Sequence, residues 1–247
     1  MRSSTTVQVF DSAEQVAEAA AQQFVELANN AAAEHAPFAV ALAGGNTPRR
    51  MYELLAGDQF RNRVDWAAVH LFFGDERCVP RDHPESNYRM AHEALISHVD
   101  IPASNVHPIE GEGDPVTNAA RYEAELREFY HGDSTPRFDL VLLGLGEDGH
   151  TASLFPDTAA LAVTQKCVVA NRVEKLKSYR ITLTASAINA AANVTFLVTG
   201  DNKARVVSAV LTGPFQPEIL PAQLIKPRAG TRMWLLDSRA ASLLTKI

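Results

Sequence analysis

The sequence alternates short apolar runs of strand length with segments in which apolar residues recur at helical spacing. Glycine-containing turns follow many of the runs, as in PFAVALAGG at 37–45 and FDLVLLGLG at 138–146. This alternation is typical of parallel βα units, in which a helix crosses back over the sheet after each strand. We therefore predict an α/β fold with a mostly parallel sheet flanked by helices, with 138–146 as its central strand.

The first predicted helix follows a short strand at 7–10 and illustrates how the element ends are assigned. Asp11, with Glu14 three residues later, is expected to open this helix as a capping box. The segment VHLFFGDER at 69–77 is expected to be the third strand with the turn that follows it. Further strands are expected in KCVVAN, YRITLT, NVTFLVTG and RMWLLD.

Composition excludes several classes of protein. The 247 residues are 46% hydrophobic, which is ordinary for a globular chain, and the net charge is -6 with Lys and Arg dispersed. We therefore expect no nucleic acid partner. Only Cys78 and Cys167 are present, without a CxxC motif, which favours a reducing cytoplasm. No apolar run approaches the ~18 residues of a membrane helix, and the N-terminus lacks an export signal, so we expect no membrane span.

A single domain over residues 1–247 is the simplest organisation. The segment GPFQPEILPAQLIKPRAG at 213–230 contains four prolines and is expected to be a long surface connection. It is not taken as a domain boundary because the strand and helix pattern resumes after it.

Polar and glycine-rich residues follow four of the predicted strands. These segments are GGNTPR at 44–49, GDER at 74–77, GLGEDGH at 144–150 and TGDNK at 199–203. In an open parallel sheet the carboxyl ends of the strands lie along one edge, where ligands bind. We therefore expect the four segments to meet in one site.

The segment GGNTP is the best candidate for binding a phosphate. Gly44 and Gly45 allow the backbone to approach a ligand, Asn46 and Thr47 add side-chain donors, and Pro48 fits the first turn of a helix. In the alternative interpretation the glycines only form a tight turn, and Asn46 or Thr47 is the N-cap. The spacing matches neither a P-loop nor a dinucleotide-binding fingerprint.

Three cations at strand ends add to the phosphate hypothesis. Arg49 and Arg77 offer planar guanidinium groups, and Lys203 lies just after the strand at 193–200. Each alone is most simply a solvated surface charge. Together they favour a compact phosphomonoester as the ligand.

The segment GLGEDGH places Asp148 two residues before His150 on a loop that its glycines make tight. A histidine side chain can accept a proton at neutral pH, and a neighbouring carboxylate can fix its orientation. The apolar strand anchors the loop, and the glycines allow a base to be aimed into the cleft. The alternative is a polar turn whose histidine caps a helix formed by TASLF.

Other catalytic chemistries have weaker support. Asp75, Glu76, His83 and His150 are residue types that bind metals, but no HExxH or similar ligand spacing is present, so we expect no metal. There is no GxSxG motif, and neither cysteine lies in a nucleophile motif.

The chain resembles a known family, the 6-phosphogluconolactonases of the pentose phosphate pathway, which are related to the glucosamine-6-phosphate deaminases. The matching segments are LAGGNTPRRMYELL, FFGDERCVPRDHPESNYRMAHEALI, FDLVLLGLGEDGHTASLFP, RITLT, and the late VTGDNK to LPAQLIKP. They span almost the full length. The patterns DERxVPxDHxxSN and GxxxDGHTASLFP are the specific ones.

The resemblance implies a parallel α/β fold with a Rossmann-like core, of the NagB/RpiA-like type, and hydrolysis of 6-phospho-D-glucono-1,5-lactone without a cofactor. It implies that His150 is the general base for a water molecule and that Asp148 orients it. The phosphate would rest on Gly44–Thr47, with Arg77 and Lys203 supplying positive charge. Either cation, or a backbone N–H of residues 144–149, would stabilise the oxyanion.

Two features qualify this assignment. Asn46 stands where the family usually has serine, so an amide replaces a hydroxyl in the expected phosphate site. Asp75 matches the proton-abstracting aspartate of the deaminase relatives, so it does not discriminate the two activities. The forms DERCVP and DGHTASLFP favour the lactonase.

Two other functions stay open at this stage. In a deaminase and isomerase of an amino-sugar phosphate, Asp75 would remove the C2 proton and His150 would assist ring opening. A non-catalytic sugar-phosphate sensor would keep the phosphate site, but it would have no need of Asp148 and His150. Family precedent favours a monomer.

Overall fold

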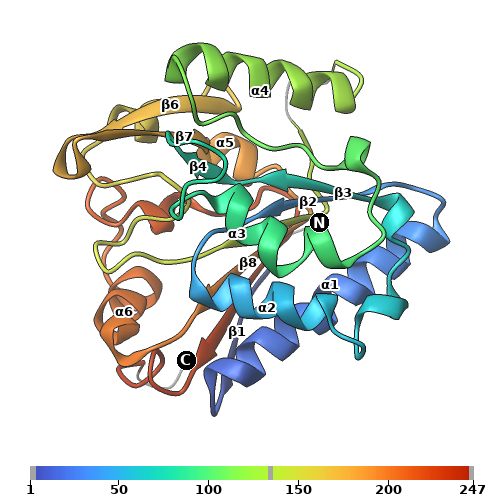
Figure 1. The fold of residues 1–247 in the computed structure, drawn as a ribbon. Helices are drawn as coiled ribbons and strands as arrows, with labels where there is room; N and C mark the ends of the chain where they lie inside the picture. Colours follow the sequence, from blue (N-terminus) through green and yellow to red (C-terminus); the bar gives the residue numbers. More distant parts are fainter. Residues whose placement is uncertain (1–3, 133–135, 245–247) are drawn as a thin grey trace.

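The computed structural model describes residues 4–132 and 136–244, and a six-stranded sheet forms its centre (Figure 1). The strand order is β1-β9-β8-β5-β2-β3, and every neighbouring pair is parallel. The bounds are β1 Ser4–Phe10, β2 Phe38–Leu42, β3 Val69–Phe73, β5 Leu140–Leu143, β8 Asn193–Val198 and β9 Thr231–Asp237. The predicted α/β fold with a mostly parallel sheet is therefore confirmed.

The central strands are buried along their whole length. All residues of FAVAL in β2 and LVLL in β5 are buried, as expected for strands that helices or loops cover on both faces. Strand β5 lies between β8 and β2. The prediction that 138–146 contains a central strand is thus confirmed.

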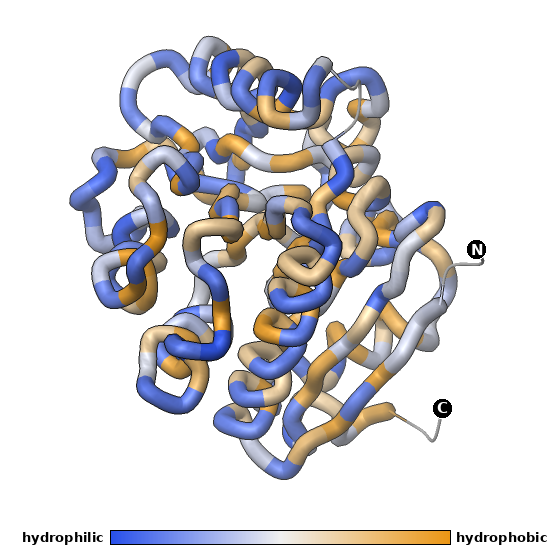
Figure 2. Tube along the Cα trace, turned by 90° about the vertical axis from the view of Figure 1, so that its right-hand side faces the viewer, coloured by the Kyte–Doolittle hydropathy of each residue, from blue (hydrophilic) through white to orange (hydrophobic). Residues whose placement is uncertain are grey.

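Helices pack against this central sheet and against a second, three-stranded sheet. Their bounds are α1 Ala13–Ala33, α2 Asn46–Ala56, α3 Asn87–Ala94, α4 Pro115–Phe129, α5 Ala185–Ile188 and α6 Ala204–Thr212. Helices α1 and α2 contact each other, and α1 also contacts β1, β2, β8 and β9 (Figure 1). Figure 2 shows hydrophilic and hydrophobic residues alternating along the helices, as expected when one face of a helix is buried.

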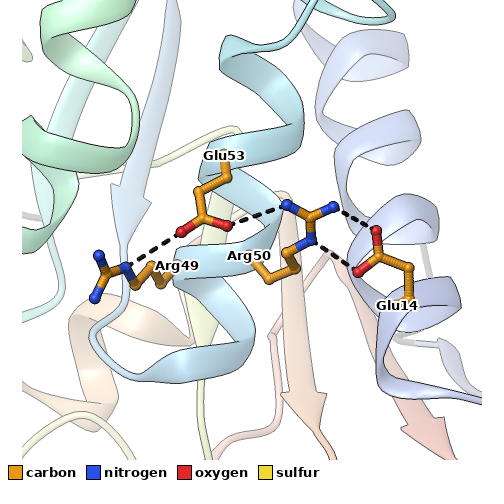
Figure 3. A network of polar contacts seen from close by, with 4 residues as sticks. All are labelled: Glu14, Arg49, Arg50 and Glu53. Carbon is orange, nitrogen blue, oxygen red and sulfur yellow. Dashed lines mark hydrogen bonds and ion pairs between the residues drawn. The ribbon is translucent and has the colours of Figure 1, made fainter.

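Helix α1 begins one residue later than predicted. Ser12 is its N-cap and accepts a hydrogen bond from the Gln15 N–H at 3.3 Å, while the Gln15 side chain accepts from the Asp11 N–H at 2.9 Å. The predicted capping box of Asp11 and Glu14 is therefore wrong. Glu14 instead forms an ion pair with Arg50 at 2.6 Å, which ties α1 to α2 (Figure 3).

The chain leaves the parallel sheet at Gly74 and enters a second, antiparallel sheet. This sheet has the order β4-β7-β6, with β4 Asp75–Arg77, β6 Val168–Val173 and β7 Ser178–Leu183. The Gly74 N–H donates to the Leu42 carbonyl, and the Gly74 carbonyl accepts from the Leu183 N–H, both at 2.8 Å. The prediction that 75–77 only forms a turn is therefore wrong. The sequence did not reveal this strand because three residues are too few to show an alternation of apolar and polar side chains.

Two buried tyrosines satisfy the backbone where β2 and β3 end. The Tyr52 hydroxyl donates to the Ala43 carbonyl at 2.9 Å and accepts from the Ala43 N–H at 3.0 Å. The Tyr122 hydroxyl does the same for Phe73, at 3.1 and 2.8 Å. Burial raises the pKa of both phenols, so they stay protonated and able to donate. Each hydroxyl thus makes the two hydrogen bonds that a neighbouring strand would otherwise make, just before a glycine-containing loop.

The proline-containing segment 213–230 is only partly a surface connection. Its short 3-10 helix Pro221–Leu224 carries the buried residues Ala222 and Gln223, and the Ala222 N–H donates to the Gly149 carbonyl at 2.9 Å. The side chain of Gln223 accepts from the Gln216 N–H and donates to the Pro214 carbonyl. This segment therefore packs against the 144–150 loop, contrary to the prediction.

Within residues 4–132 and 136–244, none of the helices combines the length and the apolar character that crossing a membrane requires.

The tyrosine hydroxyls give a testable prediction for stability. Tyr52→Phe and Tyr122→Phe should each lower the free energy of unfolding by about 1–3 kcal/mol, because each leaves a buried N–H and carbonyl unsatisfied. Urea denaturation measures this change. Tyr130→Phe is the matched control, since the Tyr130 hydroxyl is buried without a hydrogen-bond partner among the described residues. Equal losses in all three variants would contradict the assigned role.

Candidate active site

A cavity of about 480 Å³ opens at the carboxyl ends of the central strands. All four segments that the sequence analysis singled out contribute to its lining. The predicted site residues that line it are Gly44, Gly45, Asn46, Thr47, Asp75, Arg77, His150 and Lys203. The prediction that these segments meet is therefore confirmed.

The loop before α2 leaves the start of this helix open toward the cavity. Gly45 is the N-cap, with φ 106, and α2 begins at Asn46. The alternative in which Asn46 or Thr47 is the N-cap is therefore wrong. Because a glycine cap has no side chain to accept from the first helical N–H groups, these donors are available to an anion. The Thr47 hydroxyl lies 2.8 Å from the Thr199 hydroxyl, which joins this loop to the end of β8.

Asn87, at the start of α3, explains why residue 44 is glycine. Its amide donates to the Asp75 carbonyl at 2.9 Å and to Asp75 Oδ1 at 3.3 Å. A Cβ atom at Gly44 would lie 2.1 Å from Asn87 Oδ1, so only glycine fits beside this amide. Asn87 lines the cavity and was missed as a site residue, although it lies in the DERxVPxDHxxSN pattern.

The two adjacent carboxylates of β4 have different surroundings. Asp75 lines the cavity, is 8% exposed, and accepts a hydrogen bond from the Ser153 hydroxyl at 2.6 Å. Glu76 is 2% exposed and accepts from the N–H groups of Arg77, Asn87 and Tyr88, all at 2.8 Å. Burial raises the pKa of Glu76 despite these donors. Glu76 therefore anchors the start of α3.

Metal binding finds no support in the described part of the chain. Among residues 4–132 and 136–244, no group of three or more His, Cys, Asp and Glu side chains could hold a metal ion. His83 accepts a hydrogen bond from the Glu85 N–H within its own loop.

The 144–150 loop holds His150 against the cavity. His150 Nδ1 lies 2.5 Å from Asp148 Oδ1, and the imidazole stacks on Phe155 with ring centroids 4.0 Å apart. A Cβ atom at Gly146 would lie 2.0 Å from His150 Nδ1, so glycine is required there. The alternative in which His150 caps a helix at 151–155 is wrong, because these residues form turns and an isolated bridge between Thr151 and Leu154.

The ionisation of Asp148 determines which nitrogen of His150 can act as a base. Partial burial disfavours the charged carboxylate, but hydrogen bonds from Lys175 and His150 outweigh it and lower the pKa of Asp148 to about 2. An ionised carboxylate can only accept, so Nδ1 of His150 carries the proton. Nε2 is then the ring nitrogen that can accept one.

Lys175 is the second residue that the sequence analysis missed. Its Nζ contacts Asp148 Oδ2 from the turn between β6 and β7, 27 positions away in the sequence. A lysine in the polar stretch VEKLKS gives no sequence signal, because its partner is set by tertiary packing.

The three predicted cations are placed differently. Lys203 ends the 3-10 turn Asp201–Lys203 and lines the cavity, as does Arg77, which also donates to the Glu85 carbonyl. Arg49 lies on the exposed side of α2, where it pairs with Glu53 at 3.3 Å (Figure 3). The prediction that Arg49 contributes to this site is therefore wrong.

Comparison with known proteins gives a consistent result. The family model for glucosamine-6-phosphate isomerases/6-phosphogluconolactonase matches residues 11–234. A 6-phosphogluconolactonase from Synechocystis sp. is 44% identical over 213 residues, which cover 85% of this chain and 86% of that protein. The 6-phosphogluconolactonase from Homo sapiens is 40% identical over 243 residues, covering 97% and 93%.

A solved structure extends this similarity to the fold. The 6-phosphogluconolactonase from Trypanosoma cruzi has a TM-score of 0.86 and 30% identity, and the match covers 100% of this chain and 99% of that one. The resemblance seen in the sequence is thus confirmed over nearly the whole length. The chain belongs to the family of glucosamine-6-phosphate isomerases and 6-phosphogluconolactonases.

Proposed function

We propose that this protein is a sugar-phosphate lactonase that hydrolyses 6-phospho-D-glucono-1,5-lactone to 6-phospho-D-gluconate, a step of the oxidative pentose phosphate pathway. Two relatives named 6-phosphogluconolactonase are 44% and 40% identical to this chain and match most of its length. The observation that carries the proposal is that His150, which is paired with Asp148, lines the same cavity as the open start of α2.

The phosphate of the substrate binds at the start of α2. The backbone N–H groups there favour an anion, and the side chains of Asn46 and Thr47 add donors. Lys203 supplies positive charge from the end of β8, near the Thr47–Thr199 contact that joins the two segments. An amide at Asn46 can replace the usual serine because it also donates hydrogen bonds.

His150 is the general base. Its Nε2 takes a proton from a water molecule as the water oxygen attacks the C1 carbonyl. The tetrahedral intermediate then collapses, the bond between C1 and the ring oxygen breaks, and His150 returns the proton to that oxygen. The products are a carboxylic acid at C1, which ionises, and a hydroxyl at C5. Asp148 fixes the ring and stabilises the imidazolium that forms between the two steps.

Arg77 is the strongest candidate for stabilising the oxyanion. It lines the cavity from the same strand as Asp75. Two backbone donors of the 144–149 loop are already engaged, because Gly146 N–H donates to the His150 carbonyl at 2.8 Å and Gly149 N–H donates to the Gly146 carbonyl at 3.0 Å. A charged donor in a partly enclosed site stabilises a developing negative charge.

We extend the proposal to the setting of the enzyme. Residues 1–247 act as one domain, because residues of both sheets share one hydrophobic core. The protein acts as a cytoplasmic monomer, without nucleic acid or a cofactor. The dispersed cations and the net charge of -6 support the absence of a nucleic acid partner.

The base assignment gives a kinetic prediction. His150→Ala should lower kcat by about two to four orders of magnitude, because a general base contributes that much. The measurement is hydrolysis of freshly generated lactone near pH 7, corrected for the spontaneous rate. A variant that keeps most of the wild-type activity would contradict the role of His150. Release of ammonia from glucosamine 6-phosphate by the wild-type protein, without lactone hydrolysis, would instead support the deaminase hypothesis.

The phosphate assignment predicts a different kinetic change. Lys203→Met should raise KM for the lactone about tenfold or more with a smaller effect on kcat, because the lysine contacts a part of the substrate that does not react. Arg49→Met is the matched control, since Arg49 adjoins the phosphate segment but faces solvent. An equal rise of KM in both variants would indicate a general effect of the protein's net charge and would contradict the role of Lys203 in binding the phosphate.

A further inference from the structure

Asp148 is held from two sides. Its Oδ1 is bonded to His150 Nδ1 at 2.5 Å, and its Oδ2 is bonded to Lys175 Nζ. Lysine, carboxylate and imidazole therefore form a continuous chain that ends at the cavity. Lys175 itself is 63% exposed and does not line the cavity, so its connection to the site runs through Asp148.

The hairpin that carries Lys175 is fixed on the segment that follows His150. Asn171 of β6 is 2% exposed and donates to the Ser153 carbonyl at 2.9 Å and to the Thr158 hydroxyl at 3.1 Å. From β7, the Thr182 hydroxyl accepts from the Ser153 N–H at 3.2 Å. Three hydrogen bonds, of which the two to Ser153 are buried, therefore set the position of the hairpin relative to the loop.

The turn of the hairpin places Lys175 at its tip. Strands β6 and β7 pair from Val168–Leu183 to Val173–Ser178, and the short 3-10 helix Glu174–Leu176 joins them. Lys177 closes the turn in the left-handed conformation, with φ 49. A lysine on a fixed hairpin loses less freedom on pairing than one on a mobile loop.

We propose that Lys175 is a positioning residue that holds the Asp148 carboxylate in the orientation that fixes the tautomer of His150. This inference rests on the proposed lactonase function. With Oδ2 held by the ammonium group, Oδ1 is directed at Nδ1, and Nε2 is left as the base. In other sites too, the groups that are hydrogen-bonded to a functional imidazole, or to its carboxylate partner, fix the orientation of the ring.

Lys175 also balances the negative charge of Asp148 in the Asp148–His150 pair. The charged groups that act directly on Asp148 are Lys175 and His150, whereas Glu147 of the same loop is bonded to Asn202 at 2.7 Å. The cavity adds Asp75, Arg77 and Lys203 on the side of His150. Removing the ammonium group leaves the carboxylate unbalanced, which favours the imidazolium over the neutral imidazole.

The test is Lys175→Met, measured as kcat, KM and the pH dependence of lactone hydrolysis. We expect kcat to fall about tenfold through loss of orientation and KM to change less than about twofold. The acid limb of kcat/KM should move to higher pH by about 0.5 unit, from the lost charge. Thermal stability should hardly change, because an ion pair of an exposed lysine contributes little to folding.

Three further variants separate positioning from a structural role. Lys175→Arg should restore most of kcat and the wild-type acid limb. Lys177→Met, on the same turn, should behave as wild type. In an Asp148→Asn background, Lys175→Met should have little further effect, because the lysine acts through Asp148. Wild-type kcat and pH dependence in Lys175→Met, or an equal loss in the Asp148→Asn background, would overturn the proposal.

A readout independent of activity distinguishes this inference from the proposed function. The tautomer of the neutral His150 imidazole can be read from its nitrogen chemical shifts by NMR, with His150→Ala to assign the signals. We expect the proton on Nδ1 in wild type and a mixture of the Nδ1–H and Nε2–H forms in Lys175→Met, which would support the positioning role even if the lactone is not the substrate. An unchanged tautomer in Lys175→Met would contradict the role even if wild type hydrolyses the lactone.

Discussion

The site depends on how strands β2 and β3 end. Buried N–H and carbonyl groups that face no neighbouring strand need other partners, and here the hydroxyls of Tyr52 and Tyr122 satisfy those of Ala43 and of Phe73 on the edge strand β3. Directly after these points the chain can turn sharply, at Gly44 toward α2 and at Gly74 toward the second sheet. Residues 44–47 and strand β4 therefore leave the same edge of the core from fixed positions.

The second sheet completes what the parallel sheet cannot supply alone. Strand β4 brings Asp75 and Arg77 to the cavity, and because side chains alternate along a strand, Glu76 between them points to the start of α3. The β6–β7 hairpin docks on the segment after His150 and carries Lys175 to Asp148. A small antiparallel unit thus contributes Asp75 and Arg77 to the lining of the cavity and Lys175 to the Asp148–His150 pair.

The sequence was informative where local patterns decide the structure. Buried strands, glycine turns and the rule that ligands bind at the carboxyl ends of parallel strands predicted the sheet and the meeting of four segments. It failed where tertiary contacts decide. The strand register that separates Asp75 from Glu76, the helical phase that turns Arg49 to solvent, and the contact of Lys175 with Asp148 all depend on residues distant in the sequence. Asn87 lies in the DERxVPxDHxxSN pattern, but its place beside Gly44 is likewise a tertiary contact that the sequence does not show.

The most direct test of this account is a crystal structure with 6-phospho-D-gluconate bound. We expect the phosphate at the backbone N–H groups that open α2, near Lys203, and the C1 carboxylate within hydrogen-bond distance of His150 Nε2. Binding with the phosphate at His150, or in the separate cavity of about 540 Å³ lined by Arg81 and Arg121, would contradict it.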